Sequence, residues 1–240
     1  VWVFSGDYKL QADNISEPFE PVKCHVFISE STFGLPVYKW SPQQTVFDDI
    51  NQWWRNNQEA GKVSVIAGYS LGKAQRILRN IDPTLGKIFV HGAVDNITTI
   101  LRNQHIALPP TLRVTPEMKR KDFDGALIVC PPSAVGSPWL RRFDPYSLGI
   151  TSGWMNLRGA RRRRGADRGF VLSDHADWGD LNLAIEATEA ERVYVTHGYT
   201  SVFSRWLREK GIESYEVETR YEGELAEMNA SDKEQDELNP

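Results

Sequence analysis

Short apolar runs alternate with amphipathic stretches along most of the chain. Apolar runs of strand length occur at 1–4, 25–28, 62–67, 125–130 and 192–196. Apolar residues recur at helical spacing at 43–58, 71–80, 181–188 and 201–210. Strands that alternate with helices indicate an α/β fold built in layers.

The chain opens directly on the apolar run Val1–Phe4, without a methionine. A strand this apolar needs neighbours on both of its faces. We therefore expect the sequence to be a fragment of a longer protein or a processed chain.

Composition indicates an ordinary globular protein. The 240 residues are 40% hydrophobic and 25% charged, and no apolar run reaches the length of a membrane span or resembles a signal peptide. The two cysteines, Cys24 and Cys130, form neither a disulfide framework nor a metal motif, so we expect a reducing cytoplasm.

The net charge of −4 hides an uneven distribution. Residues 222–240 alone carry −6, which leaves +2 for the rest, and we expect 223–240 to be a disordered acidic tail. The cluster Arg158, Arg161, Arg162, Arg163 and Arg164 is suited to neutralising phosphates, with a solvated surface loop as the alternative.

Candidate catalytic side chains follow several of the predicted strands. Asp7, Glu30 and His197 each come after an apolar run, and His175 follows another at 170–172. Active sites of α/β proteins lie at the carboxyl ends of their strands. One such residue alone is more often a turn residue, but four together indicate a site, and Asp and His are ligand types that zinc prefers.

The amino-acid sequence of these segments resembles that of a known family. In chain order, 5–8 (SGDY), 29–34 (SESTFG), 173–177 (SDHAD) and 195–198 (VTHG) resemble the later motifs of metallo-β-lactamase/β-CASP nucleases. Segments 152–155, 161–164 and 167–177 are most similar to the bacterial ligase-associated DNA exonucleases, also described as mRNA 3′-end processing factors.

The resemblance implies a fold and a domain order. It implies a partial metallo-β-lactamase αββα sandwich formed by 1–33 and 168–222, with a β-CASP α/β domain inserted at 34–167. The sandwich is expected to be partial because the family's His-x-His-x-Asp-His motif and a further ligand histidine do not occur in this sequence. Both would precede Val1.

The resemblance also assigns roles residue by residue. It implies that Asp7 bridges two metal ions and that His197 is a ligand of the second. Glu30 would orient a histidine, and His175 would be the proton donor to the leaving oxygen. The implied cofactor is Zn²⁺, two per complete site, with another divalent metal as an alternative.

The implied substrate is nucleic acid, with DNA preferred over RNA, and an ATP-dependent DNA ligase and a helicase as partners. The family likeness places Lys73 near the substrate backbone. Ser133 and Ser152–Gly153 are candidate phosphate contacts through hydroxyl and backbone N–H groups, with ordinary turn chemistry as the alternative.

Two other functions stay open at this point. Gly68–Gly72 reads G-x-S-x-G after a strand and before a helix, which predicts a nucleophile elbow with Ser70 as nucleophile and Asp174 and His197 as partners. An HGGG-like oxyanion loop does not occur in the sequence, which counts against this hydrolase hypothesis. A non-enzymatic nucleic-acid-binding role is the third hypothesis.

Overall fold

The computed structural model describes residues 1–157 and 165–217, and they form two compact units. Of the described residues, the first unit comprises 1–12, 18–39 and 174–217, and the second comprises 13–17, 40–157 and 165–173. The boundaries expected from the sequence lie after residue 33 and before residue 168. The strand that begins at Arg168 pairs within the sheet of the second unit, and the chain returns to the first unit at Asp174. The expected acidic tail at 223–240 lies outside the described residues.

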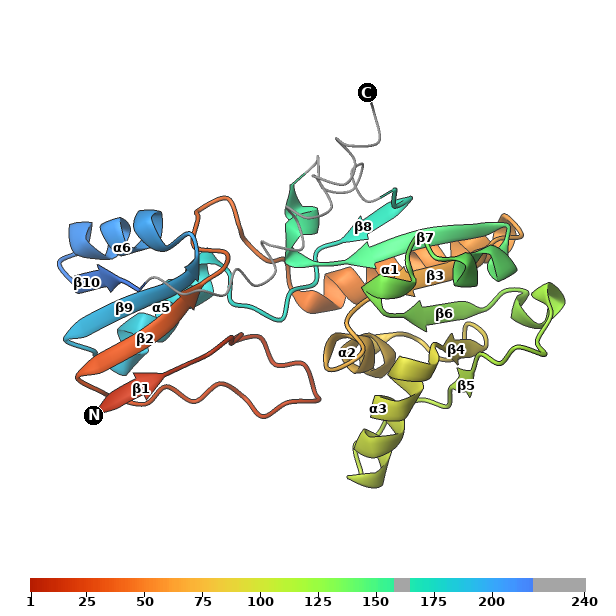
Figure 1. The fold of residues 1–240 in the computed structure, drawn as a ribbon, viewed down its shortest axis with the longest axis horizontal. Helices are drawn as coiled ribbons and strands as arrows, with labels where there is room; N and C mark the ends of the chain where they lie inside the picture. Colours follow the sequence, from red (N-terminus) through yellow and green to blue (C-terminus); the bar gives the residue numbers. More distant parts are fainter. Residues whose placement is uncertain (158–164, 218–240) are drawn as a thin grey trace. The chain divides into compact units, whose positions relative to one another are not determined.

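The first unit contains a four-stranded parallel sheet in the order β1-β2-β9-β10 (Figure 1). Its elements are β1 Trp2–Phe4, β2 Val26–Ser31, α5 Trp178–Thr188, β9 Arg192–Gly198, α6 Thr200–Glu209 and β10 Glu213–Glu216. Helices α5 and α6 bury one face of this sheet, where their apolar side chains pack against Phe27, Val193 and Val195.

The opposite face of the same sheet carries exposed apolar side chains. Phe4, Ile28, Tyr194 and Tyr215 lie in register, one on each strand. Phe4 is 70% exposed, and Tyr194 stacks on Tyr215 at 5.2 Å between ring centroids. Trp2, 68% exposed, stacks on Tyr194 from the other side.

The second unit contains a six-stranded parallel sheet in the order β5-β4-β6-β3-β7-β8. Its strands are β3 Val63–Ala67, β4 Ile88–Val90, β5 Leu112–Arg113, β6 Leu127–Cys130, β7 Tyr146–Thr151 and β8 Arg168–Phe170. Its α-helices are α1 Gln43–Glu59, α2 Lys73–Asn80 and α3 Gly92–Asn103. Its 3-10 helices are η1 Arg120–Phe123, η2 Pro132–Ala134, η3 Pro138–Phe143 and η4 Gly153–Asn156.

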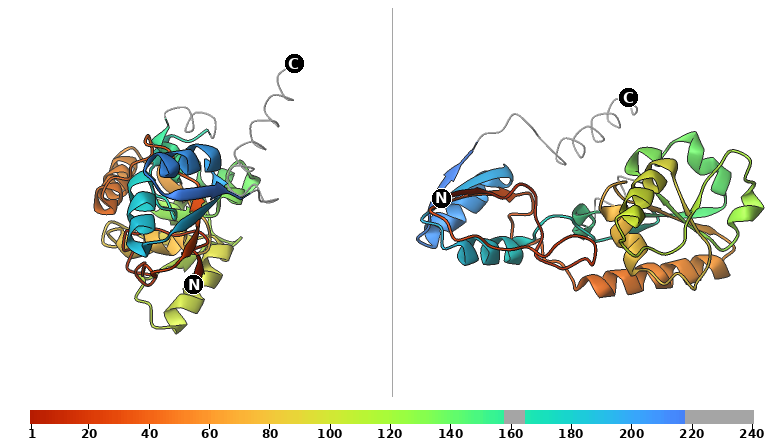
Figure 2. Two further views of the ribbon diagram at one scale, coloured as in Figure 1. Left: turned by 90° about the vertical axis from the view of Figure 1, so that its left-hand side faces the viewer. Right: turned by 90° about the horizontal axis from the view of Figure 1, so that it is seen from below.

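Both faces of this second sheet are covered, and each has its own hydrophobic core. Helices α1, α2 and α3 contribute to one core, and the 3-10 helices to the other. Figure 2 shows α1 lying along one face and the 3-10 segments on the opposite face. Parallel strands are typically buried on both sides, and every residue of β3 is buried accordingly.

The α/β prediction is therefore confirmed, with parallel sheets in both units. Among the described residues, no helix is long and apolar enough to cross a membrane. Cys24 and Cys130 are free thiols, and burial in β6 raises the pKa of Cys130 to about 12. Cys130 is therefore an unreactive core residue at neutral pH.

Candidate functional site

Three adjacent parallel strands of the first unit end at candidate site residues. Asp7 follows β1 after the turn at Gly6, Glu30 lies near the end of β2, and His197 lies near the end of β9. His175 comes from the loop before α5, whose first turn is capped by the Asp177 side chain. Since all strands run the same way, these carboxyl ends lie at one edge of the sheet.

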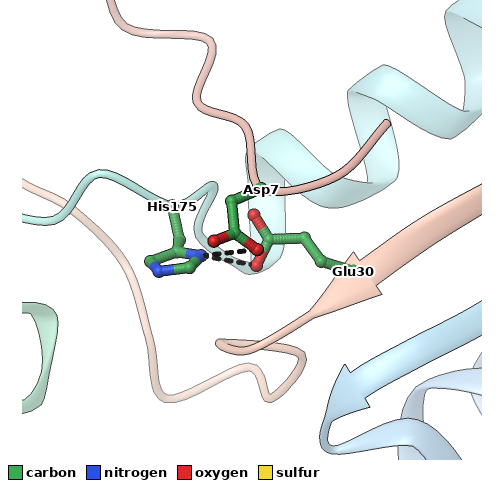
Figure 3. A group of neighbouring side chains, drawn as sticks. All are labelled: Asp7, Glu30 and His175. Atoms are coloured by element: carbon green, nitrogen blue, oxygen red, sulfur yellow. Dashed lines mark hydrogen bonds and ion pairs between the residues drawn. The ribbon is translucent and has the colours of Figure 1, made fainter. Parts of the chain in front are cut away.

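Glu30 and His175 form a buried, hydrogen-bonded pair (Figure 3). His175 Nδ1 lies 2.7 Å from Glu30 Oε2, and the two side chains are only 9% and 2% exposed. The other carboxylate oxygen, Oε1, accepts the backbone N–H of Tyr8 at 2.9 Å. Each carboxylate oxygen thus has a fixed partner, which is the condition under which a buried charge is tolerated.

Asp7 lies beside this pair but is exposed. Its Oδ1 is 3.9 Å from His175 Nδ1, and its side chain is 69% exposed. Ligand atoms of Asp7, Glu30 and His175 all come within 4.8 Å of one another, and they are the group of potential metal ligands among the described residues.

These residues fit a zinc site only in part. Carboxylate and imidazole are suitable donors. However, Glu30 Oε2 and His175 Nδ1 are bonded to each other, so they are not turned toward a shared ion. Asp7 is left as the exposed donor of this group, whereas a zinc site needs three or four protein ligands.

His197 is held in an unusual backbone conformation. Its φ is 60°, and Gly198 follows with φ 76°. The register between β2 and β9 shifts at this point, and the Ser31 hydroxyl donates to the His197 carbonyl at 2.5 Å. A Cβ at Gly198 would lie 2.4 Å from the Ser31 carbonyl oxygen, so only glycine fits there. His197 is not among the three residues of the metal-ligand group, and its role as a ligand stays a prediction.

Tyr8 is a site residue that the sequence did not predict. Its backbone N–H anchors Glu30, and its hydroxyl lies 3.0 Å from the Ser29 hydroxyl. Burial raises the pKa of Tyr8 well above its ordinary value, so the hydroxyl stays protonated. Its position directly after Asp7 was the available signal, but nothing in the local sequence reveals that its backbone contacts a residue 22 positions away.

The pKa of Asp180, an acid near this loop, is strongly raised. Burial and then the charge of Asp177 raise the pKa of Asp180 to about 6, against a partial offset from the Leu10 backbone N–H. Asp180 lies in the first turn of α5 and was not identified from the sequence.

The predicted nucleic-acid contacts of the second unit lie after three adjacent strands. Lys73 follows β3, Ser133 follows β6, and Ser152 with Gly153 follows β7. Strands β4 and β6, which come next along the chain after β3, lie on one side of β3 in the sheet. The chain then crosses to β7, on the other side of β3. Such a reversal of strand order marks the usual ligand-binding edge of an open α/β sheet.

These residues differ in exposure. Ser133 is exposed, whereas Lys73 is 2% exposed and its Nζ lies 4.7 Å from the Tyr69 ring centroid. Ser152 is buried, and its hydroxyl accepts the backbone N–H of Trp154 at 3.3 Å. Arg158 and Arg161–Arg164 lie outside the described residues.

The turn at Ser70 gives little support to the hydrolase hypothesis. A nucleophile elbow holds its serine in a strained strand-to-helix turn. Ser70 is not among the described non-glycine residues with positive φ, and α2 begins only at Lys73.

Comparisons with known proteins give a distant relative and a likeness of fold. No family model matches the chain. The "Probable DNA ligase" of Opitutus terrae is 31% identical over 220 residues, which cover 90% of this chain and 21% of that protein. The chain thus spans about a fifth of that relative's length.

A crystal structure of a protein of unknown function from Enterococcus faecalis V583 has a similar fold. Its TM-score is 0.56 at 10% sequence identity, over 91% of this chain and 56% of that one. At this identity the likeness concerns the fold alone.

Proposed function

We propose that this chain is part of a metal-dependent nuclease of the metallo-β-lactamase/β-CASP family, acting on DNA as a ligase-associated exonuclease. The observation that carries the proposal is the buried Glu30–His175 pair beside the exposed Asp7. An RNA-processing nuclease would use the same groups and is the alternative substrate class.

The geometry of the pair suits general acid catalysis. Glu30 accepts a hydrogen bond from Nδ1–H of His175. The proton needed by a leaving oxygen is therefore carried at Nε2, on the ring edge that faces away from both carboxylates (Figure 3). Glu30 fixes the orientation of the ring, while Phe33 packs edge-on against it at 5.9 Å between ring centroids.

A divalent metal, when bound, would lower the pKa of a water molecule and stabilise charge on the scissile phosphate. Asp7 and His197 are the residues of this chain that we propose as its ligands. Their donor types suit zinc, and another divalent metal is an alternative.

The exposed sheet face supports the partial sandwich. An all-parallel sheet normally has both faces covered. Here one face is covered by α5 and α6, and the other carries Phe4, Ile28, Tyr194 and Tyr215 in one row. Half of an αββα sandwich would present such a face.

Context also supports a nucleic-acid substrate. The relative from Opitutus terrae bears the name of a DNA ligase, which supports an ATP-dependent DNA ligase as a partner. A helicase is the second partner that we propose. At the edge of the second sheet we propose four residues as substrate contacts, of which Ser133 is exposed: Lys73, Ser133, Ser152 and Gly153. Two free thiols fit the reducing cytoplasm that we propose as the compartment.

The test uses the natural protein that carries this sequence, with labelled single- and double-stranded DNA and RNA, with and without chelator. His175→Asn should lower turnover by on the order of 10²–10⁴-fold while bound metal stays unchanged, because His175 donates a proton and is not a ligand. Ser70→Ala is the matched control and should keep its activity. Loss of metal in the His175 variant, or chelator-insensitive activity lost with Ser70, would contradict the proposal.

A further inference from the structure

A pocket of about 530 Å³ lies in the first unit, outside the Glu30–His175 site. Its walls come from the loop after β2, the start of α5 and one side of α6, and include Pro36, Trp178, Ser201 and Val202. Pockets that bind small ligands are roughly 300–1,000 Å³. The volume is therefore sufficient for one planar ligand group.

The walls of this pocket continue directly from the site segments. Pro36 follows the loop that begins at Glu30, Trp178 comes three residues after His175, and Ser201 comes four residues after His197. The start of each wall therefore lies within six residues, along the chain, of a candidate catalytic group.

Two tryptophan rings give the pocket an aromatic lining. Trp178 and Trp206 pack 5.2 Å apart at an angle of 50°. Trp206 Nε1 donates to the Asn182 amide oxygen at 2.8 Å, and Trp178 packs edge-on against Phe203 at 5.5 Å. Both rings are thus fixed before any ligand binds, which lowers the entropic cost of stacking against them.

An arginine–glutamate ion pair lies at the rim. Arg205 and Glu209 both line the pocket, and the Nε of Arg205 donates to Glu209 at 2.9 Å, which orients the guanidinium. The Arg205 side chain is 77% exposed. Its two terminal nitrogens make no hydrogen bond within the described residues. They are available for an anionic oxygen. Lys210, which is outside the lining, places its Nζ 4.8 Å from the Trp206 ring centroid.

An aromatic lining beside an arginine whose terminal nitrogens make no hydrogen bond within the described residues matches a base with its phosphate better than it matches a purely apolar ligand. We propose that this pocket accepts one unpaired nucleobase of the substrate strand, stacked on the tryptophans, while Arg205 contacts the adjoining phosphate. This inference rests on the proposed nuclease function and specifies its substrate as a strand with unpaired bases. A paired base has both faces stacked inside the duplex and would first have to be flipped out.

The experiment fills the pocket and measures binding. Val202 is 48% exposed and lines the pocket, whereas Leu183 is 57% exposed on α5 and does not line it. Val202→Trp should weaken the binding of fluorescent 12-nucleotide single strands, dT and rU, by about tenfold, the order of one lost base stack. Binding of a blunt 12-base-pair duplex should stay unchanged. The control Leu183→Trp should change neither affinity.

The measurement is fluorescence anisotropy on the natural protein, in the presence of chelator so that no cleavage occurs. Arg205→Ala should flatten the salt dependence of single-strand binding by about 0.7 in slope, the value for one phosphate contact. Equal single-strand affinities of the unaltered protein and Val202→Trp would overturn the pocket assignment but leave the nuclease proposal intact. An unaltered protein that binds no nucleic acid would overturn both.

Discussion

Substitutions at Glu30 and at His175 should have strongly coupled effects on the free energy of unfolding. Glu30→Ala removes the acceptor of two buried hydrogen bonds, from Tyr8 N–H and from His175. Each buried donor left without a partner costs about 1–3 kcal/mol, so the loss of both partners should lower the free energy of unfolding by roughly 2–6 kcal/mol.

His175→Ala should cost less, since Glu30 keeps its bond from Tyr8. Each single substitution removes the hydrogen bond between the two side chains, so the double variant should lose less stability than the sum of the two single losses. A hydrogen bond to a charged group contributes about 1.5–3 kcal/mol, and we expect a coupling energy of at least about 1.5 kcal/mol between the two substitutions.

The assay is urea denaturation of the four proteins in a double-mutant cycle. The matched control is the Lys23–Glu189 ion pair of the same unit, whose side chains are 72% and 63% exposed. Exposed pairs contribute roughly 0–1 kcal/mol, so this cycle should give a small coupling energy. Additive effects of Glu30→Ala and His175→Ala, within about 0.5 kcal/mol, would show that the pair is not a structural unit.

Two further predictions follow from the backbone and the charges of the first unit. Gly198→Ala should lower the free energy of unfolding, measured in urea, by at least about 2 kcal/mol, since its Cβ would lie 2.4 Å from a carbonyl oxygen. Gly211→Ala, at a similar φ but with open space around the Cβ, should lower it by only about 1 kcal/mol. Equal losses in the two variants would contradict this reasoning. Asp180 has its pKa raised to about 6 in the folded chain, so its ionisation costs stability as pH rises from about 4 through 6. Asp180→Asn should therefore stabilise above pH 6, by about 1 kcal/mol after allowing for the solvent that screens this half-buried group, and the gain should vanish below pH 4. Denaturation midpoints at pH 4 and 7.5 test this, and a gain that does not change with pH would refute it.

Strong periodicity made several elements predictable from the sequence. The helix expected at 43–58 is α1 Gln43–Glu59, and the strand expected at 62–67 is β3 Val63–Ala67. Both bury a continuous apolar face, so the hydrophobic pattern and the tertiary structure agree.

Elements without that pattern were missed. Strand β7 contains Ser147, Gly149 and Thr151, and reads as a polar loop. The glycine is needed because a Cβ at position 149 would lie 2.9 Å from the Phe170 ring. Strand β10 buries a single residue, Ser214, at the sheet edge, so its hydrophobic signal is weak.

The candidate site was predictable in its residue types but not in its contacts. Glu30 and His175 are 145 positions apart, and spacing alone does not show that they are bonded. Their pairing was expected only from the family resemblance. Which ring nitrogen faces Glu30, and that Tyr8 supplies the other bond, are properties of the folded loops.

Those two bonds have a consequence for how the site responds to change. One oxygen of Glu30 holds the backbone of Tyr8, the residue directly after Asp7, and the other holds His175. The carboxylate therefore ties the position of the proposed metal ligand to the orientation of the proposed proton donor. A substitution at Glu30 should disturb both at once, whereas one at His175 leaves the Asp7 loop anchored. For this reason the two residues, although bonded to each other, should differ in their effect on metal retention.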